Sequence, residues 1–253
     1  MSDEPGPVTP AVIDLVIPAR DEQENITALL EALPRGWLRH VIVVDNGSRD
    51  RTADLARAGS ATVVSEPARG YGSACLAGIR WIESLDEQDA PLAVAFLDAD
   101  LADDPGKLSD LVRPIIDGEA DLVVGTRHHL AEPGALDPHQ RFGNWLACRL
   151  IGIATGQHLT DLGPMRVLRW VSLQQLDMRD RTWGWMVEMT FKAARQRLRV
   201  VEIDVPYRRR RAGRSKISGS LIGSVRAGTR ILVTIGRLWF HGAERRDSSR
   251  SPQ

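Results

Sequence analysis

An alternation of short apolar segments with helical patterns runs through the first half of the chain and constrains its fold most. Strand-like apolar runs occur at residues 12–17, 40–44, 61–64, 92–97 and 120–124, and helical patterns at 22–33, 51–58, 71–84 and 105–116. This order is typical of βαβ units, which build a mostly parallel sheet with helices on its faces. Because the strand-like runs are continuous in Val and Ile, we expect strands buried on both faces of a Rossmann-like α/β sheet.

The second half has a less regular pattern that still predicts alternating elements. We expect helices at 141–155, 185–196 and 218–240, strands at 165–168 and 200–207, and a basic loop at 208–216. A single domain is expected over residues 10–242, between flexible tails at 1–9 and 243–253.

The last expected helix is amphipathic. Arg226, Arg230 and Arg237 share one stripe, and apolar residues occupy the opposite face. Such a helix can lie on an anionic bilayer or, alternatively, pack on its own domain. Because no uncharged apolar stretch approaches the length of about 18 residues that spans a bilayer, any membrane contact is expected to be peripheral.

Charge is divided unequally along the chain, although the formal net charge of the 253 residues is zero. Residues 1–126 hold 10 basic and 23 acidic side chains, a net charge of −13, and residues 127–253 hold the reverse, +13. Such asymmetry indicates either a segment that meets anions or two halves that neutralise each other within one domain. The charge pattern alone leaves both interpretations open.

The cysteine content and the N-terminus indicate the compartment. Cys75 and Cys148 are the two cysteines, and they form no disulfide framework or zinc spacing. Met1–Pro10 contains no apolar run, so no signal peptide is expected. We therefore expect a cytoplasmic protein with reduced thiols.

Asp98 and Asp100 form the strongest local signal, since they follow directly on an apolar run. Two carboxylates two residues apart in an extended chain point the same way, with backbones about 6–7 Å apart. They can hold Mg²⁺ or Mn²⁺ and leave positions free for substrate phosphates, so that the cation neutralises a diphosphate leaving group. The alternative is a solvated acidic turn before the next helix, where Asp103 and Asp104 precede Pro105 as caps.

Two further loops follow expected strands, which is where ligands of such sheets bind. One loop spans Pro18–Glu22, and the other begins at Asp45 and contains Gly47, which permits a tight turn. A carboxylate at a strand end can accept hydrogen bonds from a ribose or a base edge. The alternative for this second loop is an ordinary turn into the next helix, capped by Ser48 or Asp50.

Taken together, several segments resemble the family 2 glycosyltransferases, the inverting enzymes with a GT-A fold. The first half contributes VIPARDEQEN (16–25), VVDNGSRDRT (43–52) and LDAD (97–100). The second half contributes TDLGPMR (160–166), GWMVEM (184–189), EIDVPY (202–207) and the basic loop, which resemble the dolichyl- and polyprenyl-phosphate sugar synthases and their bacterial relatives. The resemblance covers residues 11–235, and its specificity lies in the ordered set of motifs.

The resemblance implies a nucleotide-sugar half at residues 10–126 and an acceptor half at 127–242. The donor nucleotide would be held by Pro18, Ala19, Arg20, Glu22 and Asp45, and Mg²⁺ or Mn²⁺ on its diphosphate by Asp98 and Asp100.

Two departures from the family pattern bear on this site. Arg20 and Asp21 stand where the family often has Tyr and Asn, which removes aromatic packing at the nucleotide. Ala102 stands where the polyprenyl enzymes often carry a Gln that is a candidate metal ligand, and Asp103 is its candidate substitute.

An acceptor that is itself a phosphate requires cations, which the basic half supplies. Candidate acceptor residues are Arg127, Arg141, Arg166, Arg214 and Lys216, and both Trp183 and Trp185 are candidates to line a site for a sugar or a lipid. Arginine binds phosphate in a bidentate manner, and lysine acts as a point charge. The alternative for each cation is a surface position or an ion pair with the acidic half, and we favour this alternative for residues 208–211. The alternative for the two tryptophans is packing in the core.

The catalytic mechanism depends on the acceptor. A phosphate monoester is anionic at pH 7 and needs no general base, whereas a hydroxyl group needs a carboxylate or a His within hydrogen-bond reach. Asp161 and Glu188 are the candidate bases, and Arg127 and Arg166 are the other candidate catalytic residues. Alternatively, Asp161 shapes its Gly-Pro turn and Glu188 pairs with an arginine.

The sequence therefore predicts a metal-dependent inverting glycosyltransferase that moves a sugar from a UDP- or GDP-linked donor to a polyprenyl phosphate at the cytoplasmic membrane face. A soluble or hydroxyl-bearing acceptor is the main alternative. A sugar-nucleotide nucleotidyltransferase would need a Gly-rich first loop, which Pro18–Glu22 is not, and a non-catalytic binding protein would not need Asp98 and Asp100. Nucleic-acid binding is not expected, because the basic loop comes without a recognition helix or an aromatic RNA-binding motif.

Overall fold

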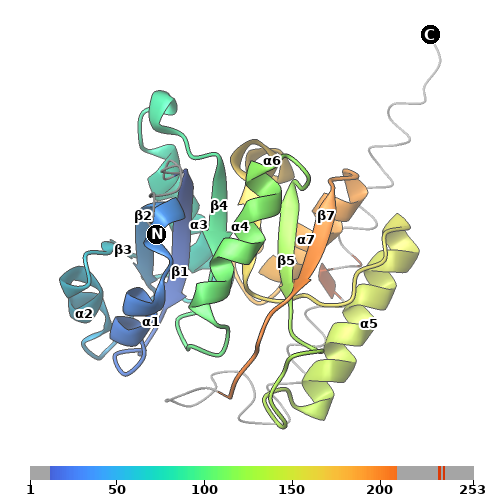
Figure 1. Cartoon of the computed structure of the whole chain (residues 1–253), viewed down its shortest axis with the longest axis horizontal. Coiled ribbons are helices and arrows are strands. Elements are labelled where there is room, and N and C mark those ends of the chain that lie inside the picture. Colours follow the sequence, from blue (N-terminus) through green and yellow to red (C-terminus); the bar gives the residue numbers. More distant parts are fainter. Residues whose placement is uncertain (1–11, 210–232, 235, 237–253) are drawn as a thin grey trace, which may run out of the picture.

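A sheet of seven strands runs through the centre of the protein (Figure 1). The structure is a computed structural model that describes residues 12–209, 233, 234 and 236. The strands are β1 (Ile13–Ala19), β2 (Leu38–Asp45), β3 (Thr62–Ser65), β4 (Ala93–Phe96), β5 (Leu122–Thr126), β6 (Arg166–Arg169) and β7 (Val200–Asp204). Their order is β3-β2-β1-β4-β6-β5-β7, and all neighbours are parallel except β6, which is antiparallel to β4 and β5. The expected mostly parallel sheet in a single α/β domain is confirmed.

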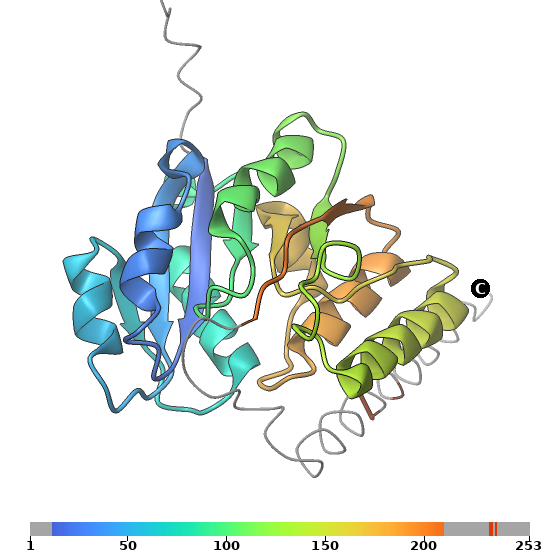
Figure 2. The same ribbon diagram turned by 60° about the horizontal axis from the view of Figure 1, so that its bottom comes forward.

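Seven α-helices of the described residues surround the sheet. They are α1 (Ile26–Ala32), α2 (Thr52–Ala58), α3 (Tyr71–Glu83), α4 (Leu108–Ile116), α5 (Pro138–Thr155), α6 (Trp170–Leu176) and α7 (Trp185–Arg195), with short 3₁₀ turns at Arg35–Trp37, Glu87–Asp89 and Pro105–Lys107. Two helical layers cover the two faces of the sheet, and α5 lies at one side of them (Figures 1 and 2).

The alternation of side chains along each strand explains the two layers, because successive residues point to opposite faces. In β1, Leu15 and Ile17 join the core under α1, α2 and α4. The intervening Val16 joins the core under α3, α6 and α7. Both sets are fully buried, so the continuous apolar runs of the sequence follow from burial on both faces.

Helix α5 is the longest described helix, and it packs outside the sheet. The side chain of Asp137 caps its N-terminus in a capping box with Gln140. Gly156 ends it with a φ of +79°. Its apolar face contacts α7 through a third cluster that includes Ile151 and Phe191. Among the described residues, no helix combines the length and apolarity needed to cross a bilayer.

Several element boundaries differ from the sequence expectation. Helix α1 begins at Ile26 instead of residue 22, because the N–H groups of Asn25 and Ile26 both bond to the Glu22 carbonyl in a preceding turn. Helix α6 was not expected. The expected helix at 218–240 lies outside the described residues except for Val233, Thr234 and Gly236.

Candidate active site

Three carboxylates, which we call the carboxylate cluster, gather where β4 ends: Asp98, Asp100 and Asp103. The chain beyond β4 turns sharply at Leu101, whose φ is +58°. In this turn Oδ1 of Asp100 accepts a hydrogen bond from the Ala102 N–H at 3.0 Å. Asp100 and Asp103 are 4% and 2% exposed, so two of the three carboxylates lie in the interior.

Asp103 is the member of the carboxylate cluster whose side chain lacks a hydrogen-bond partner among the described residues. Both of its carboxylate oxygens are buried and have no hydrogen-bond partner in the described part of the chain. Burial raises the pKa of Asp103 well above its ordinary value, Arg127 lowers it, and the charges of Asp98, Asp100 and Asp161 raise it further. An ionised Asp103 is therefore unfavourable unless a cation lies beside it.

A hard divalent cation such as Mg²⁺ or Mn²⁺ fits this donor set, since both take oxygen ligands. Asp98 and Asp100 are the residues predicted to hold it, and Asp103 lies close enough to both for their charges to raise its pKa. Within residues 12–209, no three His, Cys, Asp or Glu side chains converge as a complete metal cage would require. A cation at this position would complete its coordination with oxygens of a bound substrate, as Mg²⁺ commonly does with phosphates.

The loops that follow β1 and β2 are joined to each other by hydrogen bonds. The N–H of Asp21 donates to Ser48 Oγ at 3.0 Å, and the N–H of Arg49 donates to Asp21 Oδ1 at 2.8 Å. The N–H of Glu22 donates to Thr52 Oγ1 at 2.8 Å. The two loops therefore form one rigid unit at the carboxyl ends of the strands.

All five predicted donor residues of the first two loops lie in or beside this unit. Pro18 and Ala19 end β1, and Asp45 ends β2 opposite Ala19 in the parallel register. Glu22 is buried, and the Arg20 side chain is 33% exposed. Because β1 pairs with both β2 and β4, these residues adjoin the carboxylate cluster at one edge of the sheet.

Asn46 is a structural residue of this region that sequence reasoning missed. Its Nδ2 donates to the carbonyl oxygens of Glu66 and Ala68 at 2.9 and 2.8 Å, and its Oδ1 accepts from the Gly70 N–H at 2.9 Å. These bonds fasten the loop after β2 to the segment before α3. The available signal was its place directly after Asp45, at a strand end.

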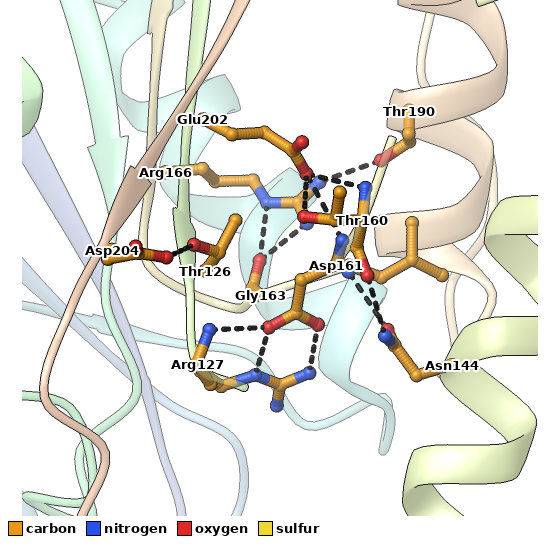
Figure 3. Close-up of polar contacts among 11 residues, drawn as sticks. Thr126, Arg127, Asn144, Thr160, Asp161, Gly163, Arg166, Thr190, Glu202 and Asp204 are labelled. Carbon is orange, nitrogen blue, oxygen red and sulfur yellow. Dashed lines mark hydrogen bonds and ion pairs between the residues drawn. The ribbon is translucent and has the colours of Figure 1, made fainter. Parts of the chain in front are cut away.

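Arg127 and Asp161 form a largely buried ion pair beyond the end of β5, with side chains 15% and 2% exposed (Figure 3). Nε and Nη2 of Arg127 donate to the two carboxylate oxygens at 2.9 and 2.7 Å, and the Arg127 N–H donates to Oδ2 at 2.7 Å. Burial acts to raise the pKa of Asp161, but the bonds from Arg127 lower it below its ordinary value. Asp161 is therefore held as a carboxylate.

Two residues far from Asp161 in sequence hold its turn in place (Figure 3). Oε1 of Glu202, on β7, accepts hydrogen bonds from the N–H groups of Thr160 and Asp161 at 2.8 and 3.1 Å. Oδ1 of Asn144, on α5, accepts from the Leu162 N–H at 2.9 Å. Sequence reasoning missed both residues, although Glu202 opens the EIDVPY motif.

The turn also lies directly on β5. A Cβ atom at Gly163 would lie only 1.8 Å from the carbonyl oxygen of Gly125, so this position requires glycine. The N–H of Gly125 donates to the Met165 carbonyl at 2.8 Å. The close approach brings Asp161 to Arg127, which follows the last residue of β5.

Tyr207 connects the ion pair with the carboxylate cluster. The guanidinium carbon of Arg127 lies 5.3 Å from the centre of the Tyr207 ring, within cation–π range. The backbone of Tyr207 bridges to Asp103, and burial raises the pKa of the Tyr207 hydroxyl. The cluster and the Arg127–Asp161 pair are thus two parts of one site.

Arg166 lies beneath this site instead of lining it. Its side chain is fully buried, and Nε donates to the Gly163 carbonyl at 3.1 Å while Nη1 lies 3.4 Å from Thr190 Oγ1. Burial lowers the pKa of the Arg166 guanidinium to about 10. The side chain has no exposed surface in this structure, and its expected contact with an acceptor or with reacting atoms stays a prediction.

Glu188 and Trp185 also occupy interior positions. Glu188 is 4% exposed, accepts from the Asp180 N–H at 2.6 Å and pairs with Lys192 at 2.7 Å. Trp185 is fully buried and lies edge-on to Phe96, with ring centroids 5.9 Å apart. These contacts favour the alternatives that the sequence had left open, ion pairing for Glu188 and core packing for Trp185, and the expected base role and acceptor contact stay predictions.

The remaining predicted acceptor residues divide into two groups. Arg141 is exposed on the first turns of α5 and keeps its place as a candidate. Arg214 and Lys216 lie outside the described residues. Of the basic loop, Arg208 pairs with Asp104 at 3.3 Å, as expected from the alternative of ion pairing with the acidic half.

Comparison with known proteins agrees with this arrangement. An uncharacterized glycosyltransferase of Mycobacterium tuberculosis is 39% identical over 214 residues, which cover 84% of this chain and 93% of the relative. An undecaprenyl-phosphate mannosyltransferase of Micrococcus luteus is 30% identical over 226 residues, which cover 82% and 88%.

A solved structure shares the fold at lower sequence identity. It is glucosyl-3-phosphoglycerate synthase from Mycobacterium tuberculosis in complex with Mn²⁺, uridine diphosphate and glucosyl-3-phosphoglycerate. It superposes with a TM-score of 0.66 at 22% identity, over 89% of this chain and 78% of the other. Residues 14–176 match the family model for glycosyl transferase family 2. The fold, the relatives and this match together show that the chain belongs to glycosyl transferase family 2.

Proposed function

We propose that this glycosyltransferase is an inverting, metal-dependent enzyme that moves a sugar from a UDP- or GDP-sugar to the phosphate of a polyprenyl phosphate. The observation that carries the choice of acceptor is the state of Asp161. Its carboxylate is buried, bonded twice to the Arg127 side chain, and shifted to a lower pKa. Such a group is a weak base, and a phosphate acceptor is the class that needs no base.

The donor would lie at the carboxyl ends of β1, β2 and β4. Asp45 and the unit formed by the first two loops would hold the nucleotide, and the carboxylate cluster would face the diphosphate through Mg²⁺ or Mn²⁺. The cation would offset the negative charge that builds up on the leaving diphosphate. The buried oxygens of Asp103, which have no hydrogen-bond partner among the described residues, support this arrangement.

The acceptor phosphate would bind at Arg127. Nη1 of Arg127 makes no hydrogen bond within the described residues and projects away from Asp161 (Figure 3). A phosphate oxygen placed there would attack the anomeric carbon from the face opposite the diphosphate. The new carbon–oxygen bond forms as the bond to the diphosphate breaks, and the leaving group departs with the electron pair. No proton transfer is required.

The relatives support both the proposed acceptor and the proposed donor with its cation. The Micrococcus luteus relative is named for undecaprenyl phosphate and mannose, and a polyprenol monophosphomannose synthase of Mycolicibacterium smegmatis is 28% identical over 87% of this chain. The solved structure contains Mn²⁺ and uridine diphosphate. It also contains a phosphoglycerate product, which keeps a small soluble acceptor as the alternative.

The direct test is a transfer assay with the full-length protein. Radiolabelled UDP- and GDP-sugars are supplied with Mn²⁺ or Mg²⁺ to undecaprenyl phosphate in detergent micelles or, in parallel, to 3-phosphoglycerate. We expect label on the lipid phosphate, with the opposite anomeric configuration to the donor. Label on phosphoglycerate alone would establish the soluble alternative, and label on neither would overturn the proposal.

Two variants sharpen this assay. Arg127→Met is expected to raise the KM for the lipid phosphate at least tenfold, since a charge-assisted bond to phosphate contributes about 1.5–3 kcal/mol. Arg57→Met is the matched control, because Arg57 is an exposed arginine paired with Asp54 on the surface of α2. Equal effects of the two substitutions would remove Arg127 from the acceptor site.

A further inference from the structure

Two aromatic side chains lie beside the carboxylate cluster without a role in the proposed chemistry. Tyr71 is the first residue of α3, and Trp183 lies in the loop before α7. Their rings are stacked with centroids 5.8 Å apart and planes inclined by 27°. Burial and the nearby carboxylate of Asp98 raise the pKa of the Tyr71 hydroxyl well above its ordinary value. Tyr71 therefore lies between a candidate donor carboxylate, Asp98, and the indole of Trp183.

The loop that carries Trp183 is fastened to the start of α3. The N–H of Gly72 donates to the Thr182 carbonyl at 3.2 Å, and the N–H of Ser73 donates to the Arg181 carbonyl at 3.0 Å. A Cβ atom at Gly70 would lie 2.1 Å from the Arg181 carbonyl oxygen. The two backbones are thus in direct contact, and a side chain at Gly70 would force them apart.

The same loop is held from its other side by Glu188. Its carboxylate accepts hydrogen bonds from the N–H groups of Arg179 and Asp180, the latter at 2.6 Å. Oδ1 of Asp180 accepts in turn from the Thr182 N–H at 2.6 Å. The loop is therefore bonded to the fold on both sides of the backbone that leads to Trp183.

Trp183 differs from its neighbour Trp185 in exposure. Trp185 is fully buried against Phe96, whereas Trp183 is 38% exposed. One face of the Trp183 indole is covered by Tyr71, and part of the ring remains accessible. A rigid, partly exposed aromatic ring beside a polar site is suited to the apolar C–H face of a sugar ring, because its own face carries partial negative charge.

We propose that Trp183, held in place by Tyr71, is the platform on which the transferred sugar of the donor rests. This inference rests on the proposed function, since it requires a nucleotide-sugar donor at the carboxylate cluster. Trp183 would contact the sugar and discriminate among donors by the shape of the sugar face. Tyr71 is a positioning residue, because it acts through Trp183 by stacking and through Asp98 by its hydroxyl group.

The test compares the affinities of a nucleotide and of the matching nucleotide sugar. Calorimetric titration of the full-length protein with Mn²⁺ measures the Kd of UDP and UDP-glucose, and of GDP and GDP-mannose. For the pair that binds, Trp183→Ala is expected to weaken the nucleotide sugar about 3- to 10-fold and to leave the nucleotide unchanged. Trp183→Phe should restore most of the loss, and Trp145→Ala, which removes an exposed tryptophan of α5, should change neither.

Tyr71→Phe separates the two contacts of the tyrosine. It keeps the stacking on Trp183 and removes the hydroxyl group near Asp98, so nucleotide and nucleotide sugar should weaken by the same factor. If Trp183→Ala weakens both ligands equally, or neither, the platform assignment is overturned while the proposed function stands. If the wild-type protein binds neither nucleotide with Mn²⁺, the proposed function itself fails, and the platform assignment fails with it.

Discussion

The two halves of the domain carry opposite net charge and hold their charged groups in different ways. In residues 12–126, Asp103 is buried with no hydrogen-bond partner among the described residues, next to two further carboxylates. In residues 127–209, Arg127 has Asp161 as a bidentate partner, and Arg166 is bonded to carbonyl and hydroxyl oxygens. The first half is electrostatically incomplete without a cation, whereas the second half carries its own counter-charge. A count of charges in the sequence therefore shows the opposite sign of the two halves without telling which charged side chains already have a partner.

The largest expected effect comes from breaking the pair in the second half. Asp161→Asn should destabilise the protein by about 3–5 kcal/mol, because it leaves the buried Arg127 without its counter-charge. Urea unfolding at pH 7 measures the loss. The control is Asp54→Asn, which breaks the exposed pair with Arg57, with side chains 74% and 60% exposed, and should change stability by less than about 1 kcal/mol.

The pH dependence of this effect has a definite sign. The folded-state pKa of Asp161 is lowered, so its stabilising contribution is present above the unfolded value of about 3.9. That contribution is lost as the pH falls through the lower folded value. The Asp161→Asn penalty should therefore shrink in acid. A penalty that is small at pH 7, or that grows toward low pH, would contradict the buried pair.

An effect of opposite sign is expected in the first half. Asp103→Asn should stabilise the protein without divalent cations by about 1–3 kcal/mol at pH 7, since it replaces a buried carboxylate with a neutral group. The raised folded-state pKa of Asp103 means that its ionisation opposes folding as the pH rises above the unfolded value. Thermal unfolding measures this gain.

Added Mn²⁺ sharpens the same comparison. It should stabilise the wild type more than Asp103→Asn, because binding to the folded state raises stability. Asp110→Asn, at a side chain that is 49% exposed, is the control and should stay within about 0.5 kcal/mol of the wild type. A destabilised Asp103→Asn protein in chelator would show that Asp103 already has a stabilising partner.

The smallest expected effects come from substitutions that loosen one loop in each half of the domain. Asn144→Ala removes the bond to the Leu162 N–H and should cost about 1–2 kcal/mol in urea unfolding. It should raise the KM for the acceptor and leave the Kd for nucleotide unchanged. Asn46→Ala removes the bonds to the segment before α3. It should raise the Kd for nucleotide and leave the KM for the acceptor unchanged. If either substitution affects both ligands equally, the two halves do not act as separate binding units.

The sheet was predictable from the sequence, because burial on both faces leaves a continuous apolar run such as Val41–Val44. The direction of β6 was not, since a strand of four residues carries no local signal for parallel or antiparallel pairing. Helix α6 was missed because it follows β6 without a turn signal, at Trp170 directly after Arg169.

The positions of candidate site residues were predictable where these residues end or follow strands. They were not predictable where the exposure of the side chain determines whether it can contact a ligand. Asp98 and Asp45 follow or end strands that the apolar pattern locates, and their ligand roles stay predictions. Trp183 and Trp185 have the same residue type two positions apart, yet one is 38% exposed and the other fully buried. Glu202 supports Asp161 from 41 residues away, and no local pattern carries such a contact.

The antiparallel strand β6 separates the strand that leads to Asp98 from the strand that leads to Arg127. It lies between β4 and β5, so the strand ends that lead to Asp98 and Arg127 are two strand widths apart, about 9–10 Å. In the proposed reaction, that separation would leave room for one sugar ring between the diphosphate of the donor and the phosphate of the acceptor. The separation arises because β6, which follows β5 in the sequence, lies antiparallel between β4 and β5 in an otherwise parallel sheet. An engineered chain with β4 and β5 as direct neighbours would keep both charged groups and lose the separation that the proposed reaction requires.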